Sequence, residues 1–351
     1  MIPVNEFIKL PEKERAAVFE ETAARLGIGR AAIVEKDFWV CWTLAQLFGP
    51  DGPADVAHAT PALLFKGGTS LSKVFGLIDR FSEDIDLVVD RTLLVGIGER
   101  PDELGIAVRE RDRRIDNICA ACTTYVRECI APFLASRTNG AKYGTVAPDL
   151  TDEQTLRFNY ARVLPASAYG GSAYVNASIR LEFGARGELW PAITGTVASY
   201  ASTEFPQLFR APAARVRALS PQRTFWEKAT ILHDIASNGK ERVKAGYSRH
   251  YSDLARIAKS ALGLGAMNDT QLLLDVARHK AVYFAKPAAK YELARPGTLR
   301  LVPTLALQKE LTKDYASMRE MFIADPPAFA EIMTEIGDIE ARINASAERH
   351  R

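Results

Sequence analysis

Hydrophobic and polar positions divide the chain into a mixed front half and a helical back half. Apolar residues recur at helical spacing over residues 11–26 and 30–48. The same period returns after about residue 206, where it predicts five helices. These are residues 220–236, 248–263, 269–285, 305–323 and 327–345.

Shorter apolar or alternating runs predict strands in the front half. They cover residues 61–66, 84–89, 155–163, 174–183 and a stretch near 192–199. A short helix is expected at 70–77, a charged helical segment at 101–137 and a polar connection at 138–153. We therefore predict an α+β fold with two domains. Residues 1–205 would form a mixed domain with N-terminal helices and a helical insertion near 95–150, and residues 206–351 a mainly helical domain.

Composition narrows the class of protein without naming a function. The 351 residues are 47% hydrophobic and 25% charged, which is ordinary globular usage. The net charge of +2 excludes a histone-like positive coat but allows a local basic groove. No uncharged apolar stretch approaches the roughly 18–20 residues that span a bilayer, and the N-terminus becomes charged too early for a signal peptide. We therefore expect a cytoplasmic protein without a membrane partner.

A glycine pair between a strand and a helix is the first candidate for chemistry. Glycines allow positive φ and let a ligand approach the backbone, and a helix N-terminus favours phosphate. Neither of the common glycine-rich nucleotide motifs, GxxxxGK[ST] and GxGxxG, occurs here, so the phosphate site would be of another kind. A Gly-Gly turn alone is more often structural. The candidate nucleotide-binding residues of this segment are Gly67, Gly68, Thr69, Ser70 and Lys73.

Two carboxylates follow the glycine pair on the next predicted strand. Asp84 and Asp86 are two residues apart, so their side chains project from one face of the strand. Two neighbouring carboxylates repel, and a divalent cation such as Mg²⁺ would remove that cost. Alone, the Asp-x-Asp pattern is equally compatible with a solvated strand face. The strand–turn–helix–strand order makes a joint site the stronger interpretation.

These motifs resemble a known family. The run FKGGTSLSKVFGLIDRFSEDIDLVVD is similar to the first motif of DNA-polymerase-β-type nucleotidyltransferases and, more narrowly, of the AbiEii/AbiGii toxins of type IV toxin–antitoxin and phage-exclusion systems. The resemblance extends over roughly residues 30–260. It implies a polymerase-β-like nucleotidyltransferase domain followed by the helical domain.

The resemblance also implies a third carboxylate on a later strand. Ile179, Leu181 and Phe183 alternate as a buried face, which leaves Arg180 and Glu182 on the opposite side. Glu182 is the candidate third metal ligand or base. An exposed glutamate paired with a neighbouring arginine is the alternative, and Glu188 would then take the role.

Two more family motifs fall in the helical half. Lys228, in SPQRTFWEKA, matches the family's lysine and would offset charge on a triphosphate. By spacing alone, Arg223, Glu227 and Lys228 are equally compatible with surface charges that include an i,i+4 pair. Asp253, in SRHYSDL, matches its aspartate. Arg249 precedes Asp253 by four residues, the spacing of a helical ion pair, so a purely structural bridge is the alternative to a role in holding Lys228 or Arg249 toward phosphate.

Two smaller patterns stay open. The run 35–37, Glu-Lys-Asp on the early helix, also resembles the family, and its charges either line the same cleft or serve packing. The dipeptide His233-Asp234 occurs in metal-dependent phosphohydrolases, but no partners stand at suitable spacing. Helical packing explains it better.

Together the resemblance implies a nucleotidyltransferase toxin. Asp84, Asp86 and Glu182 would hold two Mg²⁺ ions, with Mn²⁺ as the alternative. A nucleoside triphosphate would donate its nucleotide to RNA, most simply the 3′ end of tRNA, and so block translation. The alternatives are transfer to a protein hydroxyl and a non-catalytic nucleotide- or RNA-binding regulator. A cognate antitoxin, expected to be a winged-helix DNA-binding protein, completes the predicted partners.

Overall fold

The computed structural model describes residues 1–50, 52–54, 63–95, 100–170, 176–210, 213–239 and 242–347. The chain divides into two compact units. The first unit comprises Met1–Gly76, Phe81–Glu99 and Asp112–Leu219, and the second comprises Leu77–Arg80, Arg100–Arg111 and Ser220–Arg351.

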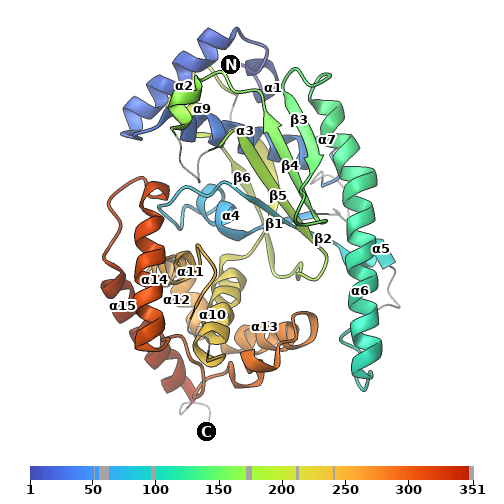
Figure 1. The fold of residues 1–351 in the computed structure, drawn as a ribbon, viewed down its shortest axis with the longest axis vertical. Helices are drawn as coiled ribbons and strands as arrows, with labels where there is room; N and C mark the ends of the chain where they lie inside the picture. Colours follow the sequence, from blue (N-terminus) through green and yellow to red (C-terminus); the bar gives the residue numbers. More distant parts are fainter. Residues whose placement is uncertain are drawn as a thin grey trace. The chain divides into compact units, whose positions relative to one another are not determined.

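A seven-stranded mixed sheet is the centre of the first unit (Figure 1). Its strands are β1 (Leu63–Lys66), β2 (Ile85–Val89), β3 (Gly144–Pro148), β4 (Thr155–Tyr160), β5 (Ser178–Gly184), β6 (Ala192–Val197) and β7 (Ala214–Leu219). Their order across the sheet is β3-β4-β5-β2-β1-β7-β6. The pairs β2–β5 and β1–β7 are parallel and the other four are antiparallel. Strand β2, which follows the glycine pair, is thus the direct neighbour of β5, which carries the candidate third carboxylate.

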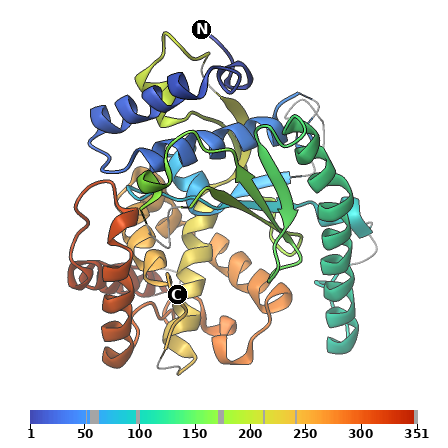
Figure 2. The same ribbon diagram turned by 45° about the horizontal axis from the view of Figure 1, so that its top comes forward.

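Helix α3 (Ala31–Phe48) lies across the sheet (Figure 2). It contacts β5 and β7, and nearly every residue from Ala32 to Phe48 is buried. Trp39 stacks on Tyr160 of β4 with ring centroids 5.6 Å apart. Because this helix is buried all round, its charged residues must find partners inside the protein.

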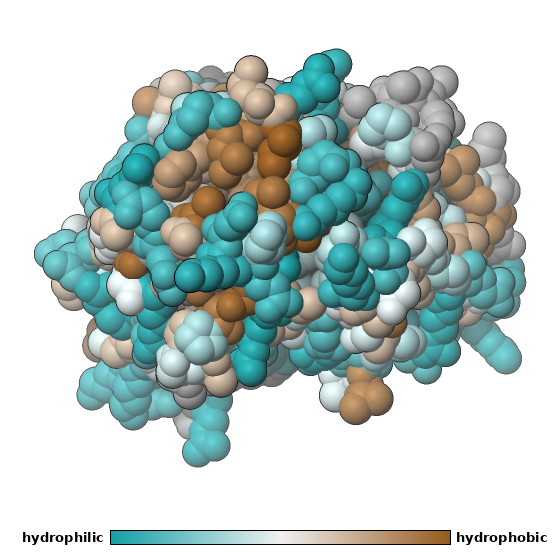
Figure 3. All heavy atoms as spheres, turned by 90° about the horizontal axis from the view of Figure 1, so that it is seen from above, coloured by the Kyte–Doolittle hydropathy of each residue, from teal (hydrophilic) through white to brown (hydrophobic). Residues whose placement is uncertain are grey.

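Within the described residues, eight further helices belong wholly or partly to the first unit, and the residues of α6 are divided between the two units. The helices are α1 (Val4–Phe7), α2 (Glu12–Leu26), α4 (Gly67–Lys73), α5 (Arg91–Val95), α6 (Val108–Tyr125), α7 (Ala131–Arg137), α8 (Ala166–Tyr169) and α9 (Tyr200–Glu204). A π-helical turn, Val126–Ile130, joins α6 to α7. Figure 3 shows a largely polar surface on one face, with an apolar area among the polar side chains.

The second unit is helical. It contains α10 (Pro221–Ser237), α11 (Ser248–Ala258), α12 (Ala261–Asn268), α13 (Thr270–Tyr283), α14 (Leu305–Ser317) and α15 (Phe329–Ala345). Three 3₁₀ turns, Pro287–Ala289, Tyr291–Leu293 and Arg319–Met321, connect them. Helices α10 and α11 form its centre, since α10 packs on α11, α12 and α13 and α11 also packs on α15.

The α+β class is confirmed, but several elements differ from those predicted, and three of the differences concern the sheet and the helical half. The segment 138–153, expected to be a polar connection, contains β3. No strand was predicted after residue 205, but β7 lies there. Alanine supplies two of the inward positions of β7, so its alternation is weakly hydrophobic. The helix expected at 248–263 breaks at Ser260, whose side chain caps α12 by accepting the N–H of Gly263. Parts of the expected strands 61–66 and 174–183 lie outside the described residues.

One helical run, Val108–Arg137, is long and apolar enough to count as a candidate membrane span by length and composition. A single helix of this kind is weak evidence, since helices of other protein classes meet the same test. Residues 108–116 of the run carry seven charged side chains, and Arg127 and Glu128 interrupt its apolar part. Charges at such positions are disfavoured at a bilayer centre.

Candidate functional site

A row of ionisable side chains crosses the middle of the sheet in the first unit. Lys66 of β1 stands opposite Asp86 of β2, and Asp86 stands beside Glu182 of β5. Residues directly paired across strands share a face of the sheet. On β5 the alternate residues Ile179, Leu181 and Phe183 are buried, which confirms the predicted alternation and puts Glu182 on the face opposite this core. Two carboxylates and an ammonium group therefore lie side by side.

Asp84 precedes this row on the approach to β2 and is fixed through its backbone. Thr69, a buried residue of α4, donates its hydroxyl to the carbonyl oxygen of Asp84 and lies 3.0 Å from the Ser82 hydroxyl. The helix that follows the glycine pair thereby holds the segment that carries the first aspartate. This gives Thr69 a structural task next to the carboxylates.

Gly67 is the point of closest approach between the glycine turn and the carboxylates. Its φ is +79°, and a Cβ built on it would lie 2.6 Å from Cγ of Asp86 and nearer still to Oδ2. No larger residue fits there without displacing Asp86. Helix α4 begins at this glycine, and its N-cap residue, Lys66, makes no side-chain cap hydrogen bond.

We expect Gly67→Ala to abolish most of the site's activity. The new methyl group would displace Asp86 from the row, and the backbone would be strained at positive φ. Gly76→Ala is the matched control. Gly76 has φ +60° but nothing within 4 Å of a built Cβ, so it carries only the backbone cost of about 1 kcal/mol. The nucleotidyl transfer that the resemblance implies should fall by about 100-fold in the first variant and little in the second. Equal losses would contradict a role for Gly67 beyond turn formation.

Two more side chains expected at the phosphate side, those of Ser70 and Lys73, are engaged within the fold. The Ser70 hydroxyl donates to the carbonyl oxygen of Gly67 at 3.0 Å, and Ser70 is buried. Lys73 forms an ion pair with buried Asp37 and its ammonium lies 3.6 Å from the centre of the Tyr200 ring. The Lys73 side chain is only 7% exposed. Its charge therefore compensates Asp37.

The charged run of α3 supports the site from within the core. Lys36 is 1% exposed and donates to Glu83, the neighbour of Asp84, and to Asn176 at 3.2 Å. Asp37 holds Lys73 on α4 and accepts the N–H of Tyr200 at 2.7 Å. The charges of this run are therefore buried rather than exposed in a cleft. Their partners, Glu83 and Lys73, belong to the segments that carry the candidate site residues.

Glu35, the third residue of that run, ties a loop to α3. Its carboxylate accepts the backbone N–H groups of Val163 and Leu164 and the hydroxyl of Tyr169. Burial raises the pKa of Glu35 in spite of these hydrogen bonds. Burial likewise raises the pKa of Glu83, against the opposing charge of Lys36.

Two cations on the site face were not among the predicted site residues. Lys66 is paired with Asp86 in the strand register, and the signal for it was present in the same Lys-Gly-Gly run. Arg180 contacts Glu182 at 3.1 Å, and its Nε has no hydrogen-bond partner among the described residues. Glu188, the fallback for Glu182, instead pairs with Arg91 at 3.2 Å.

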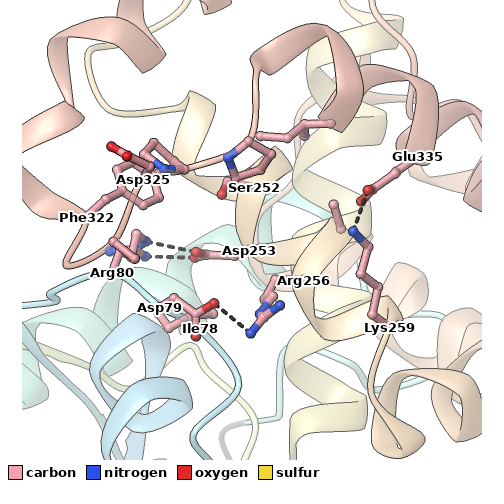
Figure 4. A pocket seen from close by; sticks show the side chains of 15 residues that line it. Ile78, Asp79, Arg80, Ser252, Asp253, Arg256, Lys259, Phe322, Asp325 and Glu335 are labelled. Carbon is pink, nitrogen blue, oxygen red and sulfur yellow. Dashed lines mark hydrogen bonds and ion pairs between the residues drawn. The ribbon is translucent and has the colours of Figure 1, made fainter.

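Lys228 and Asp253 meet in the second unit (Figure 4 shows Asp253 with Arg80). Lys228 Nζ lies 2.8 Å from Oδ2 of Asp253, and Arg80 binds the same carboxylate through Nε at 2.8 Å and Nη2 at 2.7 Å. The three side chains are at most 8% exposed. Burial alone would raise the pKa of Asp253, but the charges of Arg80 and Lys228 outweigh it and hold that pKa well below its usual range.

The alternative of a helical ion pair between Arg249 and Asp253 is not what the structure shows: Arg80 and Lys228 are the partners of this carboxylate. Arg249 is only half-buried at the start of α11. Arg80 is the residue that the sequence reasoning missed, although it stands in the quoted run before the aspartates. Burial, opposed by Asp253, lowers the pKa of Lys228.

A small cavity of about 110 Å³ opens beside this cluster, within the second unit (Figure 4). Arg80 and Asp253 form part of its wall together with Phe322 and Ile332. Two further ion pairs line it, Arg256 with Asp79 and Lys259 with Glu335. Its charges are thus mutually compensated.

Among the described residues, no group of three or more His, Cys, Asp or Glu side chains is arranged to hold a metal ion. The nearest approach to such a group by strand register is the pair Asp86 and Glu182, with Asp84 two residues away along the chain. Their oxygen atoms are the donors that Mg²⁺ prefers.

Comparison with known proteins identifies the family. The family model for the nucleotidyl transferase AbiEii toxin of type IV toxin–antitoxin systems matches residues 54–335. The chain belongs to the AbiEii family. It is thus a nucleotidyltransferase and a toxin of the type IV class, acting on a nucleotide substrate and paired with an antitoxin. The matched range includes the glycine turn, the three carboxylates and both residues of the buried lysine–aspartate pair.

A solved structure is also similar to the AbiEii chain. It is MenT4, a nucleotidyltransferase toxin from Mycobacterium tuberculosis H37Rv, with 16% sequence identity and a TM-score of 0.44. The match covers 93% of this chain and 98% of that chain. A search of curated proteins gave no match.

Proposed function

We propose that this AbiEii toxin transfers a nucleoside monophosphate from a nucleoside triphosphate to a hydroxyl of RNA, the 3′ end of tRNA, in the cytoplasm. The attacking oxygen would bond to the α-phosphorus as the bond to the pyrophosphate oxygen breaks. The observation that carries the proposal is the register that sets Asp86 beside Glu182, against the bend at Gly67.

A divalent cation, Mg²⁺ or alternatively Mn²⁺, fits the chemistry of this row. Asp86 and Glu182 are adjacent carboxylates on one face, an arrangement that a cation would stabilise. Asp84, Asp86 and Glu182 would hold it. The metal would supply Lewis-acid stabilisation of phosphate charge.

The chain's own residues would position the phosphates. Gly67 and Gly68 open the backbone at the first residues of α4, where a side chain at Gly67 would collide with Asp86. Lys66 and Arg180 stand on the same face as the carboxylates and offset their charge and that of a triphosphate. Positioning and electrostatics are the main sources of catalysis in phosphoryl-type transfer.

Lys228, Asp253 and Arg249 remain predicted catalytic or nucleotide-binding residues on the basis of the family motifs. The hydrogen bond of 2.8 Å from Lys228 Nζ to Asp253 Oδ2 supports this prediction, because it fixes the orientation of the lysine. A buried lysine held by one carboxylate is pre-organised as a point charge. Thr69, Ser70 and Lys73 would act by shaping the turn, since their polar groups are engaged within the first unit.

A nucleotidyltransferase toxin of the type IV class has an antitoxin, and we propose that it is a winged-helix DNA-binding protein. Such a protein would act on expression or by indirect counteraction, so its function needs no stable complex with the toxin. Co-expression that restores growth without co-purification would agree with this arrangement.

The acceptor is tested with triphosphates labelled at the α- or γ-phosphorus, incubated with total RNA, the divalent metal and the protein. We expect the α-label alone to enter a product that ribonuclease destroys and protease leaves intact, and we expect Glu182→Gln to abolish it. Label in a protease-sensitive product would replace the proposal with modification of a protein hydroxyl. Growth inhibition that survives Glu182→Gln without any label transfer would favour a binding regulator.

A further inference from the structure

A short exposed segment of the second unit concentrates positive charge. Residues 278–300 contain six Lys or Arg and one Glu, whereas the whole chain has a net charge of only +2. Four of these cations are solvent-exposed within 15 consecutive residues. They are Lys286, Lys290, Arg295 and Arg300. We call residues 286–300 the basic segment.

The basic segment is held in shape by a buried histidine. His233 on α10 is fully buried, and its Nδ1 accepts the N–H of Arg300 at 3.0 Å. Its Nε2 lies 3.1 Å from the carbonyl oxygen of Lys290, to which it therefore donates. Two points ten residues apart are thus joined through one imidazole ring. This explains the His233-Asp234 dipeptide without a metal.

Asp234 adds a second tie to α10 by accepting from Lys286 at 3.3 Å. Lys290 has φ +48°, a conformation that costs a non-glycine residue of order 1 kcal/mol and persists only when the surroundings fix it. The hydrogen bond to His233 is part of that fixation. The basic segment is therefore held in one conformation against α10.

Three of the four cations of the basic segment are available to a partner. Lys290, Arg295 and Arg300 form no ion pair within the described part of the chain. Such a surface fits a polyanion, and its affinity would come from phosphates, independent of base sequence. Tyr283 and Tyr291 are buried and unable to stack on bases, and the half-buried ring of Phe284 contacts Lys280 and His279.

We infer that the basic segment binds the phosphate backbone of the RNA acceptor. The inference rests on the proposed function for the choice of RNA as the polyanion. A docking site on phosphates gives the enzyme affinity for any RNA that presents a suitable end, and it makes binding sensitive to salt. Specificity for the end itself would then reside in the transfer site.

Binding of fluorescein-labelled total tRNA, followed by anisotropy, tests the inference. Replacing Lys290, Arg295 and Arg300 by Glu should weaken binding at least tenfold at low salt and reduce the slope of log K against log salt by about 2, from about 0.7 for each phosphate contact. The matched control replaces exposed Lys13, Lys309 and Lys313 by Glu, with the same change in net charge. It should bind like the wild type within about twofold.

Equal weakening in both variants, or none in either, would overturn the inference. Anisotropy needs no catalysis, so this outcome is separate from failure of the proposed function. A wild type that transfers label to RNA while the first variant binds RNA normally would refute only the docking surface. His233→Gln provides a second variant: it removes one of the two ties, keeps every cation and should weaken binding by a smaller factor than the triple variant.

Discussion

Asp86→Asn should lower the rate of nucleotidyl transfer by about 1000-fold while leaving the folded state as stable as before or more stable. The loss would follow from removing a carboxylate that we propose to hold the divalent cation, and its size is the upper range for one electrostatic group. The stability change follows from the sheet. Asp86 and Glu182 are neighbours on one face, so neutralising Asp86 removes a repulsion that offsets the loss of its attraction to Lys66.

The two readouts together separate catalysis from folding. Rate is measured with α-labelled triphosphate at saturating RNA, and stability by denaturant unfolding. A variant that loses activity because it unfolds would shift both readouts downward. Activity within tenfold of the wild type would mean that Asp86 is a solvated strand residue, the ordinary interpretation of an Asp-x-Asp pattern.

Asp253→Ala should have the largest effect on stability, lowering the free energy of unfolding of the second unit by about 3–5 kcal/mol. The substitution leaves Arg80 and Lys228 as buried cations without their counterion, and the side chains of both are at most 8% exposed. Breaking a buried ion pair costs more than the pair contributes, because one charge stays behind in the interior.

Asp79→Ala is the matched control for that experiment. Asp79 also pairs with an arginine, Arg256, at 2.6 Å, but both side chains are more than half exposed. Exposed ion pairs contribute little, so its unfolding curve should overlay that of the wild type. If the two alanine variants unfold alike, the buried cluster is not the support that the structure indicates. Replacing Arg80, Lys228 and Asp253 together by apolar residues should restore stability and leave the protein inactive.

Much of the candidate site in the first unit could be predicted from local sequence patterns. Alternation on β5 correctly assigned Glu182 to the face opposite the core, because a period of two in a half-buried strand permits only two assignments. The glycine pair and Asp84–Asp86 could be placed together because one short helix separates them. β7 could not be found the same way, since Ala214 and Ala218 give too little hydrophobic contrast.

The side-chain contacts that could not be predicted are those between segments far apart in the sequence. The spacing of Arg249 and Asp253 indicated a helical pair, but tertiary packing brings Arg80 from more than 170 positions away to the same carboxylate. Lys73 was expected at phosphate by helical proximity, and Asp37 of a buried helix takes its charge. Sequence spacing records neighbours within one element, and these contacts join different elements.

Locating a bound ion and nucleotide tests the central claim most directly. Crystals grown with Mn²⁺ and a non-hydrolysable triphosphate would show the ion by its anomalous scattering. The account predicts a peak between the carboxylates of Asp86 and Glu182, with the triphosphate against Gly67. A peak and nucleotide bound elsewhere, with this row of side chains in contact only with solvent, would contradict it.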